Sequence, residues 1–135
     1  MPLITWNDEL SVNIKEIDEQ HKKWISMLND LHEAMRIGKG SEKLDDIFDG
    51  LVEYTKVHFA TEEELLRSNG YPFYSGHKKI HDDMINEVEL LQLRHKSGEV
   101  ALSIDVMNFL KNWLSEHIMM TDKNYGPYLN SKGIG

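Results

Sequence analysis

The sequence predicts an all-α protein, an antiparallel up-down-up-down four-helix bundle with an N-terminal arm packed along it. Three observations lead to this prediction. Four long segments carry apolar residues at steps of three and four, which is the period of an α-helix. Glycine and proline gather between these segments and at their ends, and Gly50 alone falls in the middle of one. No stretch shows the sustained alternation of polar and apolar residues that is typical of a β-strand.

The expected helices cover residues of about 18–37, 41–68, 75–96 and 103–121 in a single domain, 1–135. Short polar residues that can cap a helix stand near their starts, namely Asp18, Ser41, Ser75 and Ser103. Short loops between helices of similar length favour antiparallel neighbours. The arm, 1–17, is too apolar for a free tail, and residues 122–135 are expected to form a C-terminal tail.

Composition excludes several classes of function. A net charge of −8 argues against nucleic acid and anionic membranes as partners. The absence of cysteine excludes disulfides, thiolate metal sites and cysteine nucleophiles. No apolar run reaches the roughly 18 residues of a membrane span, and Asp8 and Glu9 stand where a signal peptide needs apolar residues. We therefore expect a cytoplasmic protein and, because the charged helix faces give no strong interface signal, a monomer.

Histidine is the unusual residue of this composition. Five of the seven histidines and one glutamate fall on the apolar stripes of the expected helices: His21, His58, Glu62, His77, His81 and His117. A single core histidine is usually a hydrogen-bonded structural residue, but five with a carboxylate are hard to explain in that way. His58 and Glu62 are four residues apart, as are His77 and His81, so each pair shares one face of a helix.

These side chains are expected to meet in one layer. In an up-down-up-down bundle, the starts of the first and third helices lie at the same end as the finishes of the second and fourth. All six residues occupy such positions, and Asp122 follows just beyond. His32 and His95 lie about 16 Å and 21 Å farther along their helices, so we interpret them as surface or bundle-end residues.

Imidazole and carboxylate ligands without sulfur suit iron, whereas zinc prefers four ligands in a closed tetrahedral site. Suppose that two octahedral irons share Glu62, Asp122 and one solvent-derived oxygen. Each iron then needs three further ligands, and five histidines divide as three and two. One iron would be saturated and the other would keep a single open position.

The combined motifs resemble the hemerythrin family in its single-domain bacterial form. They are His21, HFATE at 58–62, HKKIH at 77–81 and HIMMTD at 117–122. The segment WNDELSVNIKEIDEQH at 6–21 is similar to the arm and first helix of that family. The resemblance covers nearly the whole chain, and all seven ligand positions carry the expected residue types.

This resemblance implies two iron ions per chain (Fe2+/Fe3+) with a bridging oxo or hydroxo group. It implies His77, His81 and His117 on the saturated iron, His21 and His58 on the open one, and Glu62 and Asp122 as bridges. The implied function is reversible binding of dioxygen, for storage or for delivery to oxygen-requiring enzymes. The chain itself is then not an enzyme.

Apolar residues flank the motifs, and we expect Phe59, Trp113, Leu114 and Ile118 to line an oxygen pocket. Such a wall would exclude water and protons, and it offers no general acid or base. Glu63 and Glu64 continue the acidic run from Glu62, but they lie off the core stripe and are interpreted as solvated.

Three other functions remain open. Ferritin-like di-iron oxidases use ExxH pairs on two helices, and the sequence contains none. A sensor of oxygen or redox state, or an iron-repair module, is a second alternative, although there are no cysteines for thiol chemistry. A structural zinc bundle is the third, and metal analysis would separate it at once.

The spacing of His117 and Asp122 generates a first prediction. Five residues at about 100° each place the two side chains roughly 140° apart around a regular α-helix. Both can face the site only if the fourth helix is wound differently between them, as at a π-type turn. A regular α-helix through 117–122 with both side chains in the site would contradict the prediction.

Overall fold

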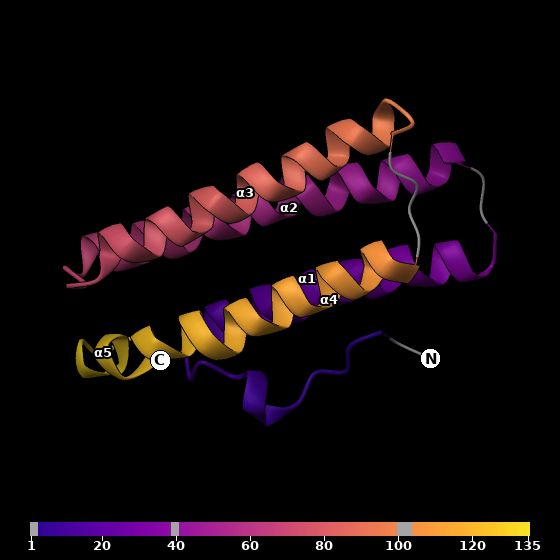
Figure 1. Cartoon of the computed structure of the whole chain (residues 1–135). Coiled ribbons are helices and arrows are strands. Elements are labelled where there is room, and N and C mark those ends of the chain that lie inside the picture. Colours follow the sequence, from indigo (N-terminus) through magenta and orange to yellow (C-terminus); the bar gives the residue numbers. More distant parts are fainter. Residues whose placement is uncertain (1–2, 39–40, 100–103) are drawn as a thin grey trace.

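The chain forms a bundle of four long helices in the computed structural model, which describes residues 3–38, 41–99 and 104–135. The helices are α1 (Lys15–Arg36), α2 (Ser41–Ser68), α3 (Tyr74–Lys96) and α4 (Ile104–Glu116). They run up and down in two layers, α1 with α4 and α2 with α3 (Figure 1). The predicted all-α bundle is confirmed, and the described residues include no strand. Ser103 and residues 1–2 of the arm lie outside the described residues.

The N-terminal arm packs along the bundle, as predicted (Figure 1). Leu10, Val12 and Ile14 are buried in it, and Lys22 lies over the ring of Trp6, with its ammonium nitrogen 5.2 Å from the ring centroid. The arm therefore contributes apolar residues to the core beside the four helices.

The start of α1 differs from the expectation at Asp18. The helix begins at Lys15 with Ile14 as its N-cap, so Asp18 lies inside the first turn and is not the cap. Its carboxylate instead accepts hydrogen bonds from the backbone N–H of Val12, at 2.8 Å, and from the hydroxyl of Ser11, at 2.5 Å. The reason is that the extended arm folds back over the helix start and presents its own donors to this carboxylate. Asp18 thus fastens the arm to the bundle.

The end of α4 confirms the prediction from the His117–Asp122 spacing. Residues His117–Thr121 form a π-helix that continues α4, and the backbone N–H of Asp122 donates to the carbonyl of His117, five residues earlier. One extra residue in the turn brings the side chains of His117 and Asp122 onto one side. A regular α-helix would direct them apart.

The expected C-terminal tail is more ordered than the sequence indicated. Asp122–Tyr125 form a 3-10 helix and Gly126–Ser131 form a short helix, α5, with Pro127 in its first turn. Tyr125 and Leu129 are buried with Val12 and Ile14 of the arm in a small apolar cluster. The last residues of the arm, before α1, therefore lie at the same end of the bundle as α5 (Figure 1).

Gly126 is needed where α5 meets the arm. A Cβ atom at this position would lie 2.5 Å from the carbonyl oxygen of Val12, closer than real Cβ atoms approach. We expect Gly126→Ala to lower the free energy of unfolding by about 1–3 kcal/mol, because backbone on both sides must move. Denaturant unfolding of the purified proteins measures this loss.

The matched control is Gly76→Ala in α3, where an added Cβ would meet no atom within 4 Å. This variant should match or exceed the wild type in stability, since alanine restricts the unfolded chain more than glycine does. Equal stability of the two variants would show that the contact between Gly126 and Val12 carries no weight.

Candidate metal centre

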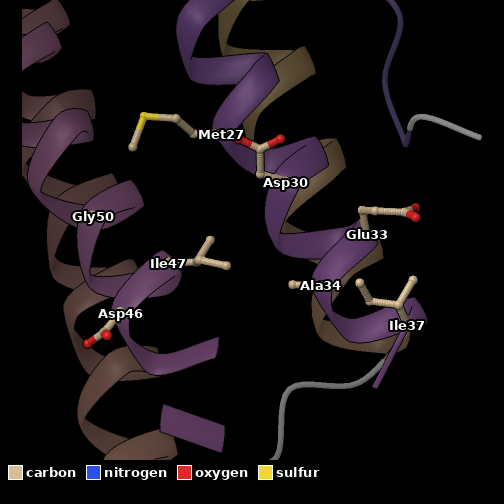
Figure 2. Close-up of a pocket in the computed structure, with 8 residues that line it drawn as sticks. All are labelled: Met27, Asp30, Glu33, Ala34, Ile37, Asp46, Ile47 and Gly50. Carbon is tan, nitrogen blue, oxygen red and sulfur yellow. The ribbon is translucent and has the colours of Figure 1, made fainter. Parts of the chain in front are cut away.

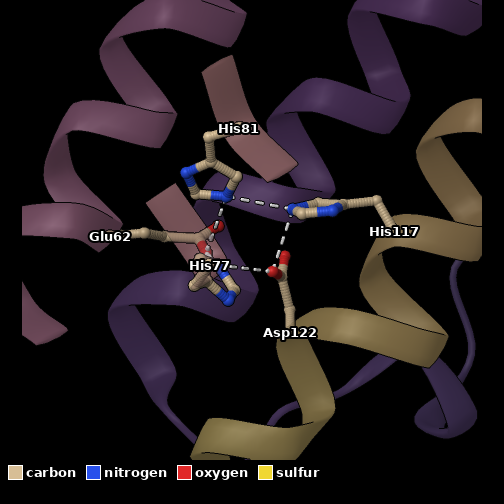
Figure 3. A group of neighbouring side chains, drawn as sticks. All are labelled: Glu62, His77, His81, His117 and Asp122. Carbon is tan, nitrogen blue, oxygen red and sulfur yellow. Dashed lines mark hydrogen bonds and ion pairs between the residues drawn. The ribbon is translucent and has the colours of Figure 1, made fainter. Parts of the chain in front are cut away.

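All seven candidate ligands lie together in the interior at one end of the bundle. α1 contributes His21, α2 contributes His58 and Glu62, α3 contributes His77 and His81, and the turns after α4 contribute His117 and Asp122. Each of them is at most 5% exposed. Figure 3 shows five of these side chains pointing toward one another from different helices.

The ligand atoms form two groups that share both carboxylates. One group, here called the three-histidine position, consists of His77, His81, His117, Glu62 and Asp122. The other, called the two-histidine position, consists of His21, His58, Glu62 and Asp122. Within each group the nitrogen and oxygen atoms that could act as ligands lie within 4.8 Å of one another.

Asp122 presents one carboxylate oxygen to each position. Its Oδ1 lies 3.0 Å from Nε2 of His117, and its Oδ2 lies 3.1 Å from Nε2 of His21. Glu62 is divided in the same way: Oε1 contacts His58, and Oε2 lies 3.4 Å from Nε2 of His77. A carboxylate with one oxygen on each side is suited to bridge two cations.

Several buried atoms of this cluster face one another at ion-pair distances, but within the described residues they have no partner with the geometry of a hydrogen bond. They are His58 Nε2, His77 Nε2, Glu62 Oε2 and both carboxylate oxygens of Asp122. Leaving such groups buried and unsatisfied costs free energy, and native structures rarely do so. Metal ions would satisfy all of them, so the residues present fit a pair of metals bound by nitrogen and oxygen.

The electrostatics of the metal-free cluster point the same way. Burial acts to lower the pKa of His21 and of His77, but Asp122 and Glu62 outweigh it and raise both values to about 9. Burial acts to raise the pKa of Glu62, yet the neighbouring imidazoles His58 and His21 hold it well below its ordinary value. The carboxylates are therefore charged, and cations or protons must balance them.

His81 behaves differently from these two histidines. Burial dominates at this residue and lowers its pKa to about 3, so the imidazole is neutral. Neutral imidazole is the form that binds a metal. Metal ions entering the cluster would therefore meet a neutral imidazole at His81 and would displace protons from His21 and His77.

Two side chains without a role assigned from the sequence accept hydrogen bonds from candidate ligands. They contact the Nδ1 atoms, which point away from the cluster. Nδ1 of His58 donates to Oε1 of Gln20 at 2.6 Å, and Nδ1 of His81 donates to Oε2 of Glu63 at 3.1 Å. With Nδ1 engaged in this way, Nε2 faces the cluster. Both partners stand next to a candidate ligand in the sequence, at positions 20 and 63, which is the one signal that could have pointed to them.

The interpretation of Glu63 as a solvated residue is wrong. Its side chain is only 16% exposed because it turns from α2 toward α3 to reach His81. Burial raises its pKa, although the ammonium group of Lys78 acts against that rise. The prediction for Glu64 is confirmed, since its exposed carboxylate pairs with the guanidinium of Arg67 on the surface of α2.

Aromatic rings border the cluster, and the apolar residues expected beside it lie in the core. Phe59, Leu114 and Ile118 are buried as expected, and Trp113 is half-buried. The ring of Phe59 stacks on that of His81, with centroids 3.8 Å apart, so it covers the three-histidine position.

Trp24 lies beside the two-histidine position, where Tyr54 and Phe59 also pack near His58. Its ring centroid lies 5.3 Å from that of His58 and 6.2 Å from that of His21. The indole N–H donates to the hydroxyl of Thr55, and that hydroxyl donates to the carbonyl of Leu51. The indole is therefore held in place with its one polar atom satisfied. Trp24 is three residues after His21 and so shares its face of the helix, but only the packing of α1 on α2 shows that it faces His58.

Tyr125 borders the three-histidine position, next to His77. It is buried, and its ring centroid lies 5.5 Å from that of His77. Burial and the nearby carboxylates of Glu62 and Asp122 raise the pKa of this phenol well above its ordinary value. The phenol therefore keeps its proton.

The remaining histidines lie away from the cluster, as predicted. His95 sits toward the far end of the bundle, where its Nε2 lies 2.6 Å from Oδ1 of Asp45. His32 belongs to neither group of metal-binding atoms. A hollow of about 410 Å³ between α1 and α2 also lies toward that end (Figure 2). Acidic and apolar side chains such as Asp30, Asp46 and Ile47 line it, and none of the seven candidate ligands does.

Comparison with known proteins agrees with this geometry. The model of the family described as "Hemerythrin HHE cation binding domain" matches residues 12–129. The chain belongs to the hemerythrin family. The family consists of oxygen-binding di-iron proteins, so the recognised resemblance is confirmed.

Named relatives cover most of this hemerythrin-family chain. A bacteriohemerythrin of Stenotrophomonas maltophilia is 39% identical over 93% of the chain and 80% of its own length. A bacteriohemerythrin of Methylococcus capsulatus is 35% identical over 97% of the chain and its whole own length. The crystal structure of a wild-type hemerythrin superposes with a TM-score of 0.87 at 33% identity, covering 93% of this chain and 96% of that one.

No helix among the described residues is both long and apolar enough to cross a membrane.

The site generates a prediction on metal content. If the seven residues hold two metals, His77→Ala should lower the iron content of the purified protein below two per chain, because it removes a ligand of the three-histidine position. His32→Ala, a histidine outside both groups, should leave the content unchanged. Elemental analysis of both variants measures this, and full iron loading of the His77 variant would exclude His77 as a ligand.

Proposed function

We propose that this chain binds dioxygen reversibly at a di-iron centre, for storage or for delivery to oxygen-requiring enzymes, and that it is not itself an enzyme. The observation that carries the proposal is the pair of adjacent positions that share Glu62 and Asp122 but differ by one imidazole. Membership of the hemerythrin family supports iron as the metal.

The residues would hold the two irons as follows. His77, His81 and His117 would bind one iron, His21 and His58 the other, and Glu62 and Asp122 would bridge them together with an oxo or hydroxo group. When bound, the iron pair supplies the electrons that reversible oxygen binding requires. The chain offers one imidazole fewer at the two-histidine position, so a coordination place remains there for a small ligand.

The surroundings favour binding over catalysis. The indole of Trp24, beside the two-histidine position, uses its N–H on Thr55. The phenol of Tyr125 lies against His77, at the three-histidine position. The expected pocket residues Phe59, Leu114 and Ile118 are buried in one apolar cluster with Trp24, and Trp113 packs against it. A wall of these side chains would exclude water and would supply no general acid or base. Among the described residues, these apolar side chains would shield a ligand at the two-histidine position from water, and they carry no group that could act as an acid or base on it.

The deciding experiment is the optical spectrum of the reduced protein, cycled between air and argon, with iron quantified. We expect two irons per chain and a spectral change that reverses over several cycles. One zinc per chain would favour the structural alternative. A spectrum that fails to return under argon, with oxygen consumed in every cycle, would favour an oxidase.

The apolar wall generates a further prediction at Leu114, which is 1% exposed. Leu114→Ala should lower the free energy of unfolding by about 2–5 kcal/mol, as expected for a buried leucine. It should also speed the conversion of the oxygenated protein to the oxidised one and speed the entry of azide, because water and anions gain access. Decay of the oxygenated spectrum in one buffer at one temperature measures the effect.

Leu31→Ala is the matched control. Leu31 is fully buried in the same apolar cluster, but it lies ten residues beyond His21, about 15 Å farther along α1. It should lose similar stability without faster decay of the oxygenated spectrum. Equal acceleration in both variants would mean that general loosening of the core, rather than the wall at Leu114, controls access.

A further inference from the structure

The outward nitrogens of the ligand histidines have unequal partners. Nδ1 of His81, at the three-histidine position, donates to the carboxylate of Glu63 at 3.1 Å. Nδ1 of His58, at the two-histidine position, donates to the amide oxygen of Gln20 at 2.6 Å. Within the described residues, Nδ1 of His21 and of His117 are buried without a hydrogen-bond partner. Among these four imidazoles, one rests on an anion and one on a neutral amide.

Glu63 is held firmly in this role. Its side chain is mostly buried between α2 and α3, and its second oxygen, Oε1, lies 3.4 Å from the ammonium nitrogen of Lys78. Lys78 is 44% exposed and also binds Asp82, so water and a second carboxylate share its charge. The ammonium group thus orients the Glu63 carboxylate and balances only part of its negative charge.

A carboxylate and an amide have different effects on a metal bound at the far nitrogen. A hydrogen bond to a carboxylate makes an imidazole more basic and therefore a stronger metal ligand, and the anionic charge adds attraction for the cation. A neutral amide orients the ring but adds no charge. Changing such a partner typically alters metal affinity by about 10- to 100-fold.

We propose that Glu63 and Gln20 are positioning residues that make the two metal positions unequal, so that the three-histidine position retains its metal and the two-histidine position releases metal first. The inference rests on the metal centre of the proposed function, but not on oxygen binding. Its consequence is that metal exchange takes place at the position with the free coordination place.

The test is release of iron from the loaded full-length protein to an excess of a ferrous chelator under argon. We expect two phases of equal amplitude, the slower one from the three-histidine position. Glu63→Gln keeps a hydrogen-bond acceptor for His81 but removes its charge, so it should speed the slow phase by about tenfold. Gln20→Glu adds the charge beside His58 and should slow the fast phase by a similar factor.

The matched control is Glu64→Gln. Glu64 is the next residue of α2 and loses the same charge, but it is exposed and pairs with Arg67. It should change neither phase. Lys78→Met removes the cation beside Glu63, so iron release in the slow phase should be slower than in the wild type. An equilibrium titration of the metal-free variants with cobalt(II) gives a second readout, and circular dichroism confirms that each variant is folded.

The outcomes separate this inference from the proposed function. If the wild type carries two irons but Glu63→Gln behaves as Glu64→Gln, or if both irons leave in one phase, the inference is wrong and the di-iron centre stands. A wild type that binds fewer than two irons contradicts the centre itself. A folded Glu63→Gln protein that retains one iron supports the inference. If the Glu63→Gln protein does not fold, the test rests on Gln20→Glu, and an unchanged fast phase in that variant overturns the inference.

Discussion

The structure depends on the burial of two carboxylates side by side in the core of a helical bundle. Glu62 and Asp122 are completely shielded from solvent, and their carboxylate oxygens belong to groups of atoms that lie within 4.8 Å of one another. Like charges so close together repel strongly where little water screens them. Five imidazoles surround the pair, and they leave several nitrogen and oxygen atoms without hydrogen bonds. Metal cations, or protons on the imidazoles, must balance such an interior. The bundle is therefore best understood as a scaffold that assembles a charged site, and this site is stable only with bound cations or protons.

Much of the unusual backbone serves to bring Asp122 into this site. The π-helix at His117–Thr121 turns Asp122 to the same side as His117, and the 3-10 helix that follows places Tyr125 against His77. The short helix α5 then packs on the arm, where Gly126 allows the backbone of Val12 to approach closely. Asp18 fastens that same stretch of arm to α1. One end of the bundle is thus closed by contacts among segments far apart in the sequence.

The two sides of the centre have different surroundings, and this difference links structure to the proposed chemistry. Phe59 stacks on His81 at the three-histidine position, where Glu63 supplies a negative charge. Trp24 and the amide of Gln20 border the two-histidine position, where the chain supplies one imidazole fewer. The first arrangement favours a firmly held, fully coordinated metal. The second favours a metal with room for a small apolar ligand such as dioxygen.

The sequence by itself predicted the four long helices and the meeting of six residues of the candidate centre at one end of the bundle, while Asp122 was assigned through the resemblance to the hemerythrin family. Local rules were sufficient for this, because helical period assigns each residue to a face and the alternating direction of the helices assigns each face to an end. Even the π-turn followed from the five-residue spacing of His117 and Asp122. Only the tertiary structure decided the roles of Asp18, Gln20, Trp24, Glu63 and the C-terminal segment that forms α5. Each of these roles depends on which side chains of different helices meet, and that depends on the packing of one helix against another rather than on the residue's own position along the chain.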